Sequence, residues 1–194
     1  MNLAFRDEIP PVPLNNNRPG LNFSPRLLLL AGIGTVAVII SFILISISAS
    51  GGISPQLQHL SARLATLQVI IKDANKSITD PDLRKITSDL SILTTGSIAQ
   101  LAAPMKAAGL DKVSDEVKKA EADTVTLKTL ADAKLAGTFD RTYARTIKLK
   151  LDTILALMNE IYTKTKSRSL KTALSSAYKD FGSIRKQLDE KINV

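Results

Sequence analysis

The chain has 194 residues but no cysteine and only one histidine, His59. Without cysteine there is no disulfide framework, no thiol nucleophile, and no thiol to bind a metal or carry a lipid anchor. Aromatic residues are also scarce, at 4% of the chain, so few side chains are available to stack on nucleic-acid bases. These absences exclude many catalytic and binding chemistries before any motif is considered.

The shortage of histidine also argues against the metal centres found in helical bundles. A di-iron site needs about four inward-facing carboxylates and two histidines, with Glu-x-x-His on two helices. The chain has no Glu-x-x-His, and its glutamates do not recur on helical stripes: Glu8, Glu116, Glu121, Glu160 and Glu190. We therefore expect no metal and no cofactor. We interpret His59 as a surface or interfacial residue, and Glu160 as a solvated one.

Catalytic motifs are missing as well. A Ser-His-Asp triad would have to use His59, and no nucleophile elbow accompanies it. The glycine pairs in the chain do not have the spacing of a phosphate-binding loop. Two acidic pairs stand at expected helix starts, where negative charge favours the helix: Asp80 with Asp82, and Asp115 with Glu116. We expect no enzyme.

One uncharged apolar run of 21 residues extends from Leu27 to Ile47. At 1.5 Å per residue it covers about 30 Å, the hydrocarbon thickness of a bilayer. We predict a transmembrane helix over residues 27–49, with anchoring residues that include Leu27, Leu30, Val36, Ile40, Phe42 and Ile47. The alternative is a signal peptide cleaved after Ser50, although signal-peptide cores run only to about 15 residues.

Charges beside this run predict its orientation. Arg18 and Arg26 precede it, whereas no basic residue follows it until Arg63. Positive charge resists translocation, so the tail of residues 1–26 should stay in the cytoplasm and the rest of the chain should cross. The tail is rich in proline and asparagine, which predicts disorder. We expect a single-pass protein of the cell membrane, with its C-terminal domain outside the cytoplasm.

After a linker of residues 50–54, helix signals fill residues 55–194. Five residues have the chemistry of helix N-caps: Ser54, Asp80, Ser114, Thr138 and Ser167. Pro104 is expected to bend or end the second segment, because proline lacks the amide hydrogen and clashes with the preceding turn. The third segment should run from Ser114 to Gly137.

Four of these segments carry an apolar stripe at spacings of three and four residues. The stripes are Leu57, Leu60, Leu64, Leu67, Ile71 and Ala74; Leu83, Ile86, Leu90 and Leu93; Tyr143, Ile147, Leu151, Ile154, Met158 and Ile161; and Leu170, Leu174, Ala177, Phe181, Ile184 and Leu188. Four such helices bury one another most simply as a four-helix bundle. The predicted class is all-α, with the weaker third segment as a long helical crossover.

The stretch Leu135-Ala136-Gly137-Thr138-Phe139-Asp140-Arg141-Thr142-Tyr143 resembles the G-x-F-D-x-x-Y start of the third core helix in a family of bacterial exported ferritin-like bundles. That family is of unknown function and is often labelled a predicted outer-membrane protein. The resemblance covers roughly residues 55–192 and implies ferritin-like topology. Family members usually carry histidines on these helices. This chain has Leu151 or a neighbour at one such position and Gln187 at another.

Positive charge gathers in the last part of the chain. Residues 138–194 hold 12 Lys and Arg against 6 Asp and Glu, a net charge of +6. Four of these residues cluster at one predicted turn: Lys164, Lys166, Arg168 and Lys171. We hypothesise that they form a patch for an anionic surface. Its partner would be anionic lipid, an anionic envelope polymer or an acidic protein. A solvated face is the alternative, and the extracytoplasmic location and lack of interleaved aromatics disfavour nucleic acid.

Two functions fit these features. The first is a non-catalytic interaction module, tethered to the membrane, that binds an envelope component through its basic helices. The second is a ligand-sensing accessory subunit of a membrane complex, in which ligand binding shifts the anchor. The cytoplasmic tail is too short to form an output domain, so a sensor would need a partner to carry its signal.

Overall fold

The computed structural model describes residues 52–193, which form α-helices and no strands. The predicted all-α class is confirmed for this part of the chain. The predicted tail, residues 1–26, and the predicted transmembrane helix, residues 27–49, lie outside the described residues. Among the helices of residues 52–193, none has both the length and the apolar composition needed to cross a bilayer.

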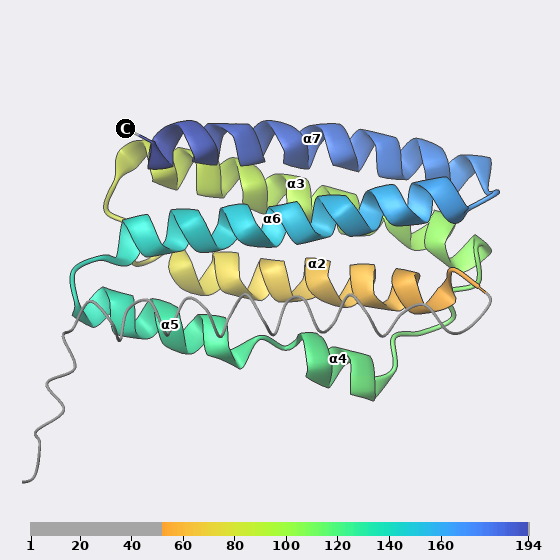
Figure 1. The fold of residues 1–194 in the computed structure, drawn as a ribbon, viewed down its shortest axis with the longest axis horizontal. Coiled ribbons are helices and arrows are strands. Elements are labelled where there is room, and N and C mark those ends of the chain that lie inside the picture. The colour runs from red at the N-terminus through yellow and green to blue at the C-terminus, as the bar shows by residue number, and fades with distance from the viewer. Residues whose placement is uncertain (1–51, 194) are drawn as a thin grey trace, which may run out of the picture. The chain divides into compact units, whose positions relative to one another are not determined.

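Four long helices make up most of the described chain. They are α2 (Ser54–Ala74), α3 (Pro81–Ala107), α6 (Phe139–Lys164) and α7 (Arg168–Ile192). Two shorter helices connect α3 to α6, namely α4 (Asp115–Glu121) and α5 (Thr124–Leu135). The long helices lie side by side and pack in the order α2, α3, α7, α6, with α6 returning to α2 (Figure 1). Both α4 and α5 lie along α2, and α5 also contacts α6.

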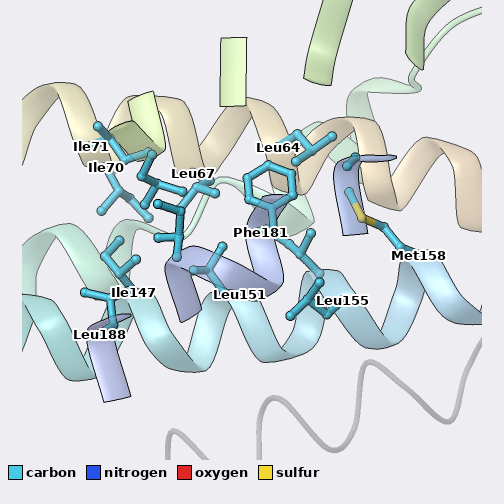
Figure 2. Packing of buried hydrophobic residues seen from close by; sticks show 14 of the residues in the cluster. Leu64, Leu67, Ile70, Ile71, Ile147, Leu151, Leu155, Met158, Phe181 and Leu188 are labelled. Carbon is cyan, nitrogen blue, oxygen red and sulfur yellow. The ribbon is translucent and has the colours of Figure 1, made fainter. Parts of the chain in front are cut away.

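The predicted apolar stripes form one core. Every stripe residue predicted on α2, α6 and α7 is buried, while in α3 only Leu93 is half-buried. Figure 2 shows Leu64 of α2, Leu151 of α6 and Phe181 of α7 within this cluster. Each fully buried Leu, Ile or Phe contributes about 1.5–3 kcal/mol relative to an exposed one. The stripes thus identify correctly the faces on which the helices associate.

Three predicted N-caps are confirmed. The side chain of Asp80 accepts a hydrogen bond from the Leu83 amide at 2.8 Å. Ser114 and Ser167 likewise accept from the amides three residues further on, each at 3.3 Å. These bonds satisfy amide groups that have no partner within the first turn of a helix.

The cap predicted at Ser54 is wrong, and Thr138 occupies the predicted cap position without making a side-chain capping bond. α2 begins at Ser54 itself, and the Ser54 hydroxyl donates to the carbonyl of Gly109 at 3.2 Å instead of capping the helix. Thr138 does precede α6, but its hydroxyl donates back to Ala133 at 3.4 Å. In both cases a carbonyl of another segment competes for the hydroxyl, which spacing along the sequence does not reveal.

The third segment is two helices rather than one. Asp123 separates α4 from α5, with a left-handed φ of 34°, and its carboxylate accepts from the Thr126 amide at 3.1 Å. Lys150 of α6 pairs with the same carboxylate. Burial alone would raise the pKa of Asp123, but the Lys150 ion pair and the Thr126 hydrogen bonds outweigh it and leave the pKa below its ordinary value.

Pro104 does not end α3, which continues to Ala107. Met105 is buried at 3% exposure, so core packing holds the last turn in spite of the proline. The helix ends where Gly109 takes a φ of 101°. The Gly109 amide then bonds to the Lys106 carbonyl, and the Leu110 amide bonds to the Met105 carbonyl at 3.0 Å. This is the Schellman arrangement, which needs a left-handed residue after the helix.

Candidate functional site

The basic cluster predicted from the sequence lies around the turn between α6 and α7. α6 ends at Lys164, α7 begins at Arg168, and Thr165 within the turn is buried. Lys166 and Arg168 are exposed, and neither makes an ion pair with any residue in the range 52–193. No Asp or Glu occurs between residues 161 and 179, so the turn is a concentrated region of positive charge.

The other two basic residues of the cluster have partners. Lys164 Nζ lies 2.6 Å from Glu160 Oε1, and Lys171 Nζ lies 5.2 Å from the centre of the Tyr162 ring. The first contact is an ion pair four residues apart on a helix, and the second is a cation–π contact. The hydrogen bond from Lys164 keeps the pKa of Glu160 below its ordinary value, although burial opposes this shift. Glu160, whose side chain is 31% exposed, is thus partly solvated as predicted, but it is also paired.

Glu160 also connects the basic turn to the start of α2. The Gln56 side-chain amide, which is 3% exposed, donates to Glu160 Oε1 at 3.3 Å. The hydroxyl of Ser54, also at the start of α2, donates to the carbonyl of Gly109 beyond the end of α3. The start of α2, the end of α3 and the α6–α7 turn thus gather at one end of the domain (Figure 1). We call this the α2-start end.

Two further lysines belong to the α2-start end. Lys106 lies in the last turn of α3, and Lys112 lies in the connection from α3 to α4; both are exposed. Sequence reasoning missed them because they are about 50 residues away from the α6–α7 turn along the chain. Only the packing of α3 against α7 brings these segments to the same end.

His59 lies away from the basic turn, on the side of α2 that α4 covers. His59 Nδ1 is 2.8 Å from Glu121 Oε1, and Arg63 Nε donates to both carboxylate oxygens of Glu121 at 3.1 Å. The Thr66 hydroxyl donates to the Glu121 backbone carbonyl at 2.7 Å. The side chains of His59 and Glu121 are 17% and 10% exposed. Of the two predicted alternatives, surface or interfacial, His59 is therefore interfacial: it is part of a polar contact that attaches α4 to α2.

This polar contact does not have the composition of a metal site. Within residues 52–193, no three His, Asp or Glu side chains are grouped so that they could hold a metal ion. The single carboxylate of Glu121 is already shared by an imidazole and a guanidinium. What the arrangement does is fix the position of a short helix.

The G-x-F-D-x-x-Y stretch has a structural role at the opposite end of the domain. Gly137, with a φ of 67°, closes α5, and Phe139 stacks on the buried Tyr143 with ring centres 6.0 Å apart. The carboxylate of Asp140 accepts from the backbone amides of Thr79 and Asp80, at 3.1 and 2.8 Å. The stretch therefore joins the start of α6 to the turn between α2 and α3.

Leu151 or a neighbour, and Gln187, occupy the positions at which the resembling family usually carries histidine. Leu151 is fully buried in the core, and Gln187 is half-buried on α7. Hydrocarbon surrounds the first position, so it offers no coordinating atom.

Comparisons of the chain with models of protein families, with curated proteins and with solved structures gave no match. Its function must therefore be argued from its own residues and their geometry.

Proposed function

We propose that this chain is a single-pass membrane protein whose extracytoplasmic domain is a non-catalytic interaction module that contacts the anionic lipid surface beside its own anchor. The domain would be a ferritin-like four-helix bundle of α2, α3, α6 and α7. The α4–α5 segment supports this topology, because α3 ends at the α2-start end whereas α6 begins at the opposite end (Figure 1). One long crossover, here between α3 and α6, which run in the same direction, is the feature that separates ferritin-like bundles from simple up-and-down ones.

The observation that carries the proposal is the position of the basic turn. It lies at the α2-start end, where the chain arrives from the predicted transmembrane helix of residues 27–49. Residues 50–53 span at most about 14 Å when fully extended. The anchor would therefore hold this end of the domain against the bilayer.

Because the anchor would hold the basic turn close to the bilayer, electrostatic attraction favours anionic lipid over an envelope polymer or an acidic protein. Each Lys or Arg near an anionic membrane surface contributes about 1 kcal/mol, and the attraction decays over about 8 Å at physiological salt. Envelope polymers and acidic proteins would experience the same field, but nothing would hold them at this end of the domain. Lys166 and Arg168, which make neither an ion pair nor a cation–π contact within residues 52–193, would supply most of the attraction.

The proposal is testable by site-specific labelling, because the chain has no cysteine of its own. The full chain is reconstituted in nanodiscs, with a fluorophore on Thr172→Cys in the second turn of α7. A second preparation carries the fluorophore on Ser183→Cys, about 16 Å further along the helix. With phosphatidylglycerol and headgroup spin-labelled lipid in the disc, fluorescence at position 172 should be quenched strongly and at position 183 weakly.

The four-Gln variant, with Lys164→Gln, Lys166→Gln, Arg168→Gln and Lys171→Gln together, should lose the quenching at position 172. A control with the same charge loss at the opposite end should retain it: Lys72→Gln, Lys76→Gln, Lys128→Gln and Lys134→Gln. Raising salt from about 0.05 to 0.5 M should act like the four-Gln variant, since the attraction is screened. Equal quenching in anionic and phosphatidylcholine discs would refute the proposal and direct attention to a polymer or protein partner.

A further inference from the structure

A groove of about 280 Å³ lies between α2 and the last third of α3. Its floor consists of Leu64, Leu101 and Met105, which are 1–3% exposed. Ile98, Leu110 and Val113 form half-buried walls. The groove is therefore an apolar slot in a part of the surface that is otherwise polar and charged.

The end of α3 determines the shape of this groove. Gly109, in its left-handed conformation, turns the chain so that the Leu110 amide bonds to the Met105 carbonyl. This turn lays Leu110 back over the last turn of α3, where it lines the groove. The wall is thus held by backbone hydrogen bonds within the chain.

Charge is asymmetric around the rim. Lys106 and Lys112 line the groove at the surface, together with one acidic residue, Asp111. The rim has a net charge of +1, which suits a single carboxylate better than a multiply charged phosphate head. An apolar slot with a small number of polar groups at one side is the usual form of a small-molecule site, though most such sites measure roughly 300–1,000 Å³. The small volume favours one narrow chain over a two-chain lipid.

We propose that this groove binds a single long-chain fatty acid. Its hydrocarbon chain would cover Leu64, Leu101 and Met105, and its carboxylate would lie between Lys106 and Lys112. The inference rests on the proposed function in one respect, namely that a groove at the α2-start end of an anchored domain is supplied with fatty acid by the adjacent bilayer. Burial of the chain would be driven by removal of apolar surface from water, at about 25 cal/mol per Å².

Photolabelling of the full chain tests the proposal. The protein is reconstituted in phosphatidylcholine nanodiscs with a 16-carbon fatty acid that carries a mid-chain diazirine. After irradiation, mass spectrometry should find the label in peptides that cover residues 98–113, and excess palmitate should remove it. Hexadecanol, which lacks the carboxylate, should compete more weakly. Label confined to residues 27–49 would overturn the proposal.

Two neighbouring alanines provide a matched pair of variants. Ala102 and Ala103 are both exposed on α3, but only Ala102 lines the groove. Ala102→Phe should fill the groove and abolish labelling of residues 98–113, whereas Ala103→Phe should preserve it. Equal labelling of the two variants would contradict the proposal. So would a disulfide-linked dimer formed through Ser61→Cys, since it would assign the groove to a second copy of the chain.

The lysines are tested separately. Lys106→Gln and Lys112→Gln should each weaken competition by palmitate roughly two- to fivefold, as expected for partly exposed ion pairs, and leave competition by hexadecanol unchanged. Failure of this inference and failure of the proposed function are distinguishable. The four-Gln variant should label normally in phosphatidylcholine discs, and Ala102→Phe should retain the lipid quenching at position 172.

Discussion

Asp140 accepts two hydrogen bonds from Thr79, one from its amide at 3.1 Å and one from its hydroxyl at 2.5 Å. The two residues are 61 positions apart, and the contact joins the first turn of α6 to the turn between α2 and α3. A third bond, from the Asp80 amide at 2.8 Å, completes the contact. Asp140 thereby satisfies backbone amides just before α3, where Asp80 itself caps the helix.

Asp140→Ala should therefore destabilise the domain by about 1–3 kcal/mol, because it leaves several donors without a partner. The measurement is urea unfolding of residues 50–194, which we expect to be cooperative. Asp132→Ala is the control, since Asp132 is exposed and pairs only with Lys128, four residues earlier on the same helix. If the two variants lose equal stability, the Thr79 contact is not important for the fold.

Tyr143→Phe should not destabilise the domain at pH 7 and should stabilise it slightly. The Tyr143 ring is fully buried, and its hydroxyl has no hydrogen-bond partner of normal geometry among residues 52–193, although Thr87 lies nearby. An unsatisfied buried hydroxyl destabilises the folded state by about 1–3 kcal/mol, so its removal should stabilise the domain. Any interaction of the hydroxyl with Thr87 reduces this gain. A loss of more than about 1 kcal/mol in urea unfolding would mean that the hydroxyl is bound.

Tyr143→Phe should also make the domain more resistant to unfolding at alkaline pH. Burial raises the pKa of Tyr143 from 10.0 to about 12. A pKa that is higher in the folded state gives stability that is complete below pH 10 and is lost as the pH rises toward 12. Tyr143→Phe removes this loss, so unfolding at pH 11 should be less favourable for the variant than for the wild type.

The contact between Lys191 and Asp80 should make stability depend on pH at both extremes. Their nitrogen and oxygen lie 2.8 Å apart, which lowers the pKa of Asp80 below 3.8 and raises the pKa of Lys191 above 10.5. The Asp80 contribution is present above pH 3.8 and is lost as the pH falls through its folded-state pKa. The Lys191 contribution is present below pH 10.5 and is lost as the pH rises further.

Lys191→Gln should abolish the loss of stability at alkaline pH that comes from Lys191. It should abolish only part of the loss of stability at acid pH, since the Leu83 amide still lowers the pKa of Asp80. Lys186→Gln is the control, because Lys186 pairs only with Glu190 on its own helix, at 3.8 Å. Thermal unfolding between pH 2 and pH 12 provides the comparison. If Lys191→Gln loses as much thermal stability at acid pH as the wild type does, Lys191 does not stabilise the Asp80 carboxylate.

Glu121→Ala should release α4 without unfolding the core. The variant leaves Arg63, 12% exposed, without its carboxylate, and none of the α4 residues is buried in the described part of the chain. A loss of about 2 kcal/mol in local stability corresponds to roughly thirtyfold faster amide exchange in α4. Amides of α6 and α7 should keep their protection. Glu116 lies on the exposed side of α4, so Glu116→Ala should change neither amide exchange in α4 nor amide protection in α6 and α7.

The full-length chain should remain in the membrane fraction through high salt and carbonate extraction. External protease should degrade residues 50–194 once the outer layer is permeabilised and should spare the cytoplasmic tail. A mature protein that begins at Gly51 in mass spectrometry would instead establish cleavage after Ser50. The domain would then be secreted, and the proposed role beside its own anchor would be excluded.

Every residue of the stripes predicted on α6 and α7 is buried, and the α7 stripe is complete, whereas Ala144, Leu155 and Leu157 of α6 are buried but were not predicted. Sequence periodicity identified the stripes because a helix that packs on one side repeats apolar residues every three or four positions. The caps at Asp80 and Ser167 were predictable for a similar reason, since their partners are only three residues away.

Features that depend on distant segments were not predictable in this way. The break at Asp123 is stabilised by Lys150 of another helix, and Ser54 binds Gly109 instead of its own first turn. His59 was interpreted as either a surface or an interfacial residue, because nothing near it in the chain indicates that Glu121 covers it. The basic turn was identified correctly as a cluster, but its neighbours Gln56 and Lys106 follow only from packing.

The packing of α7 against both α3 and α6 has a consequence for biosynthesis. The faces of α3 and α6 that α7 covers stay open until the 25 residues of this helix, Arg168–Ile192, have been made. The domain therefore cannot complete its core until α7 has left the ribosome. On the proposed extracytoplasmic location, this order of synthesis keeps the core incomplete until α7 is available to pack against α3 and α6.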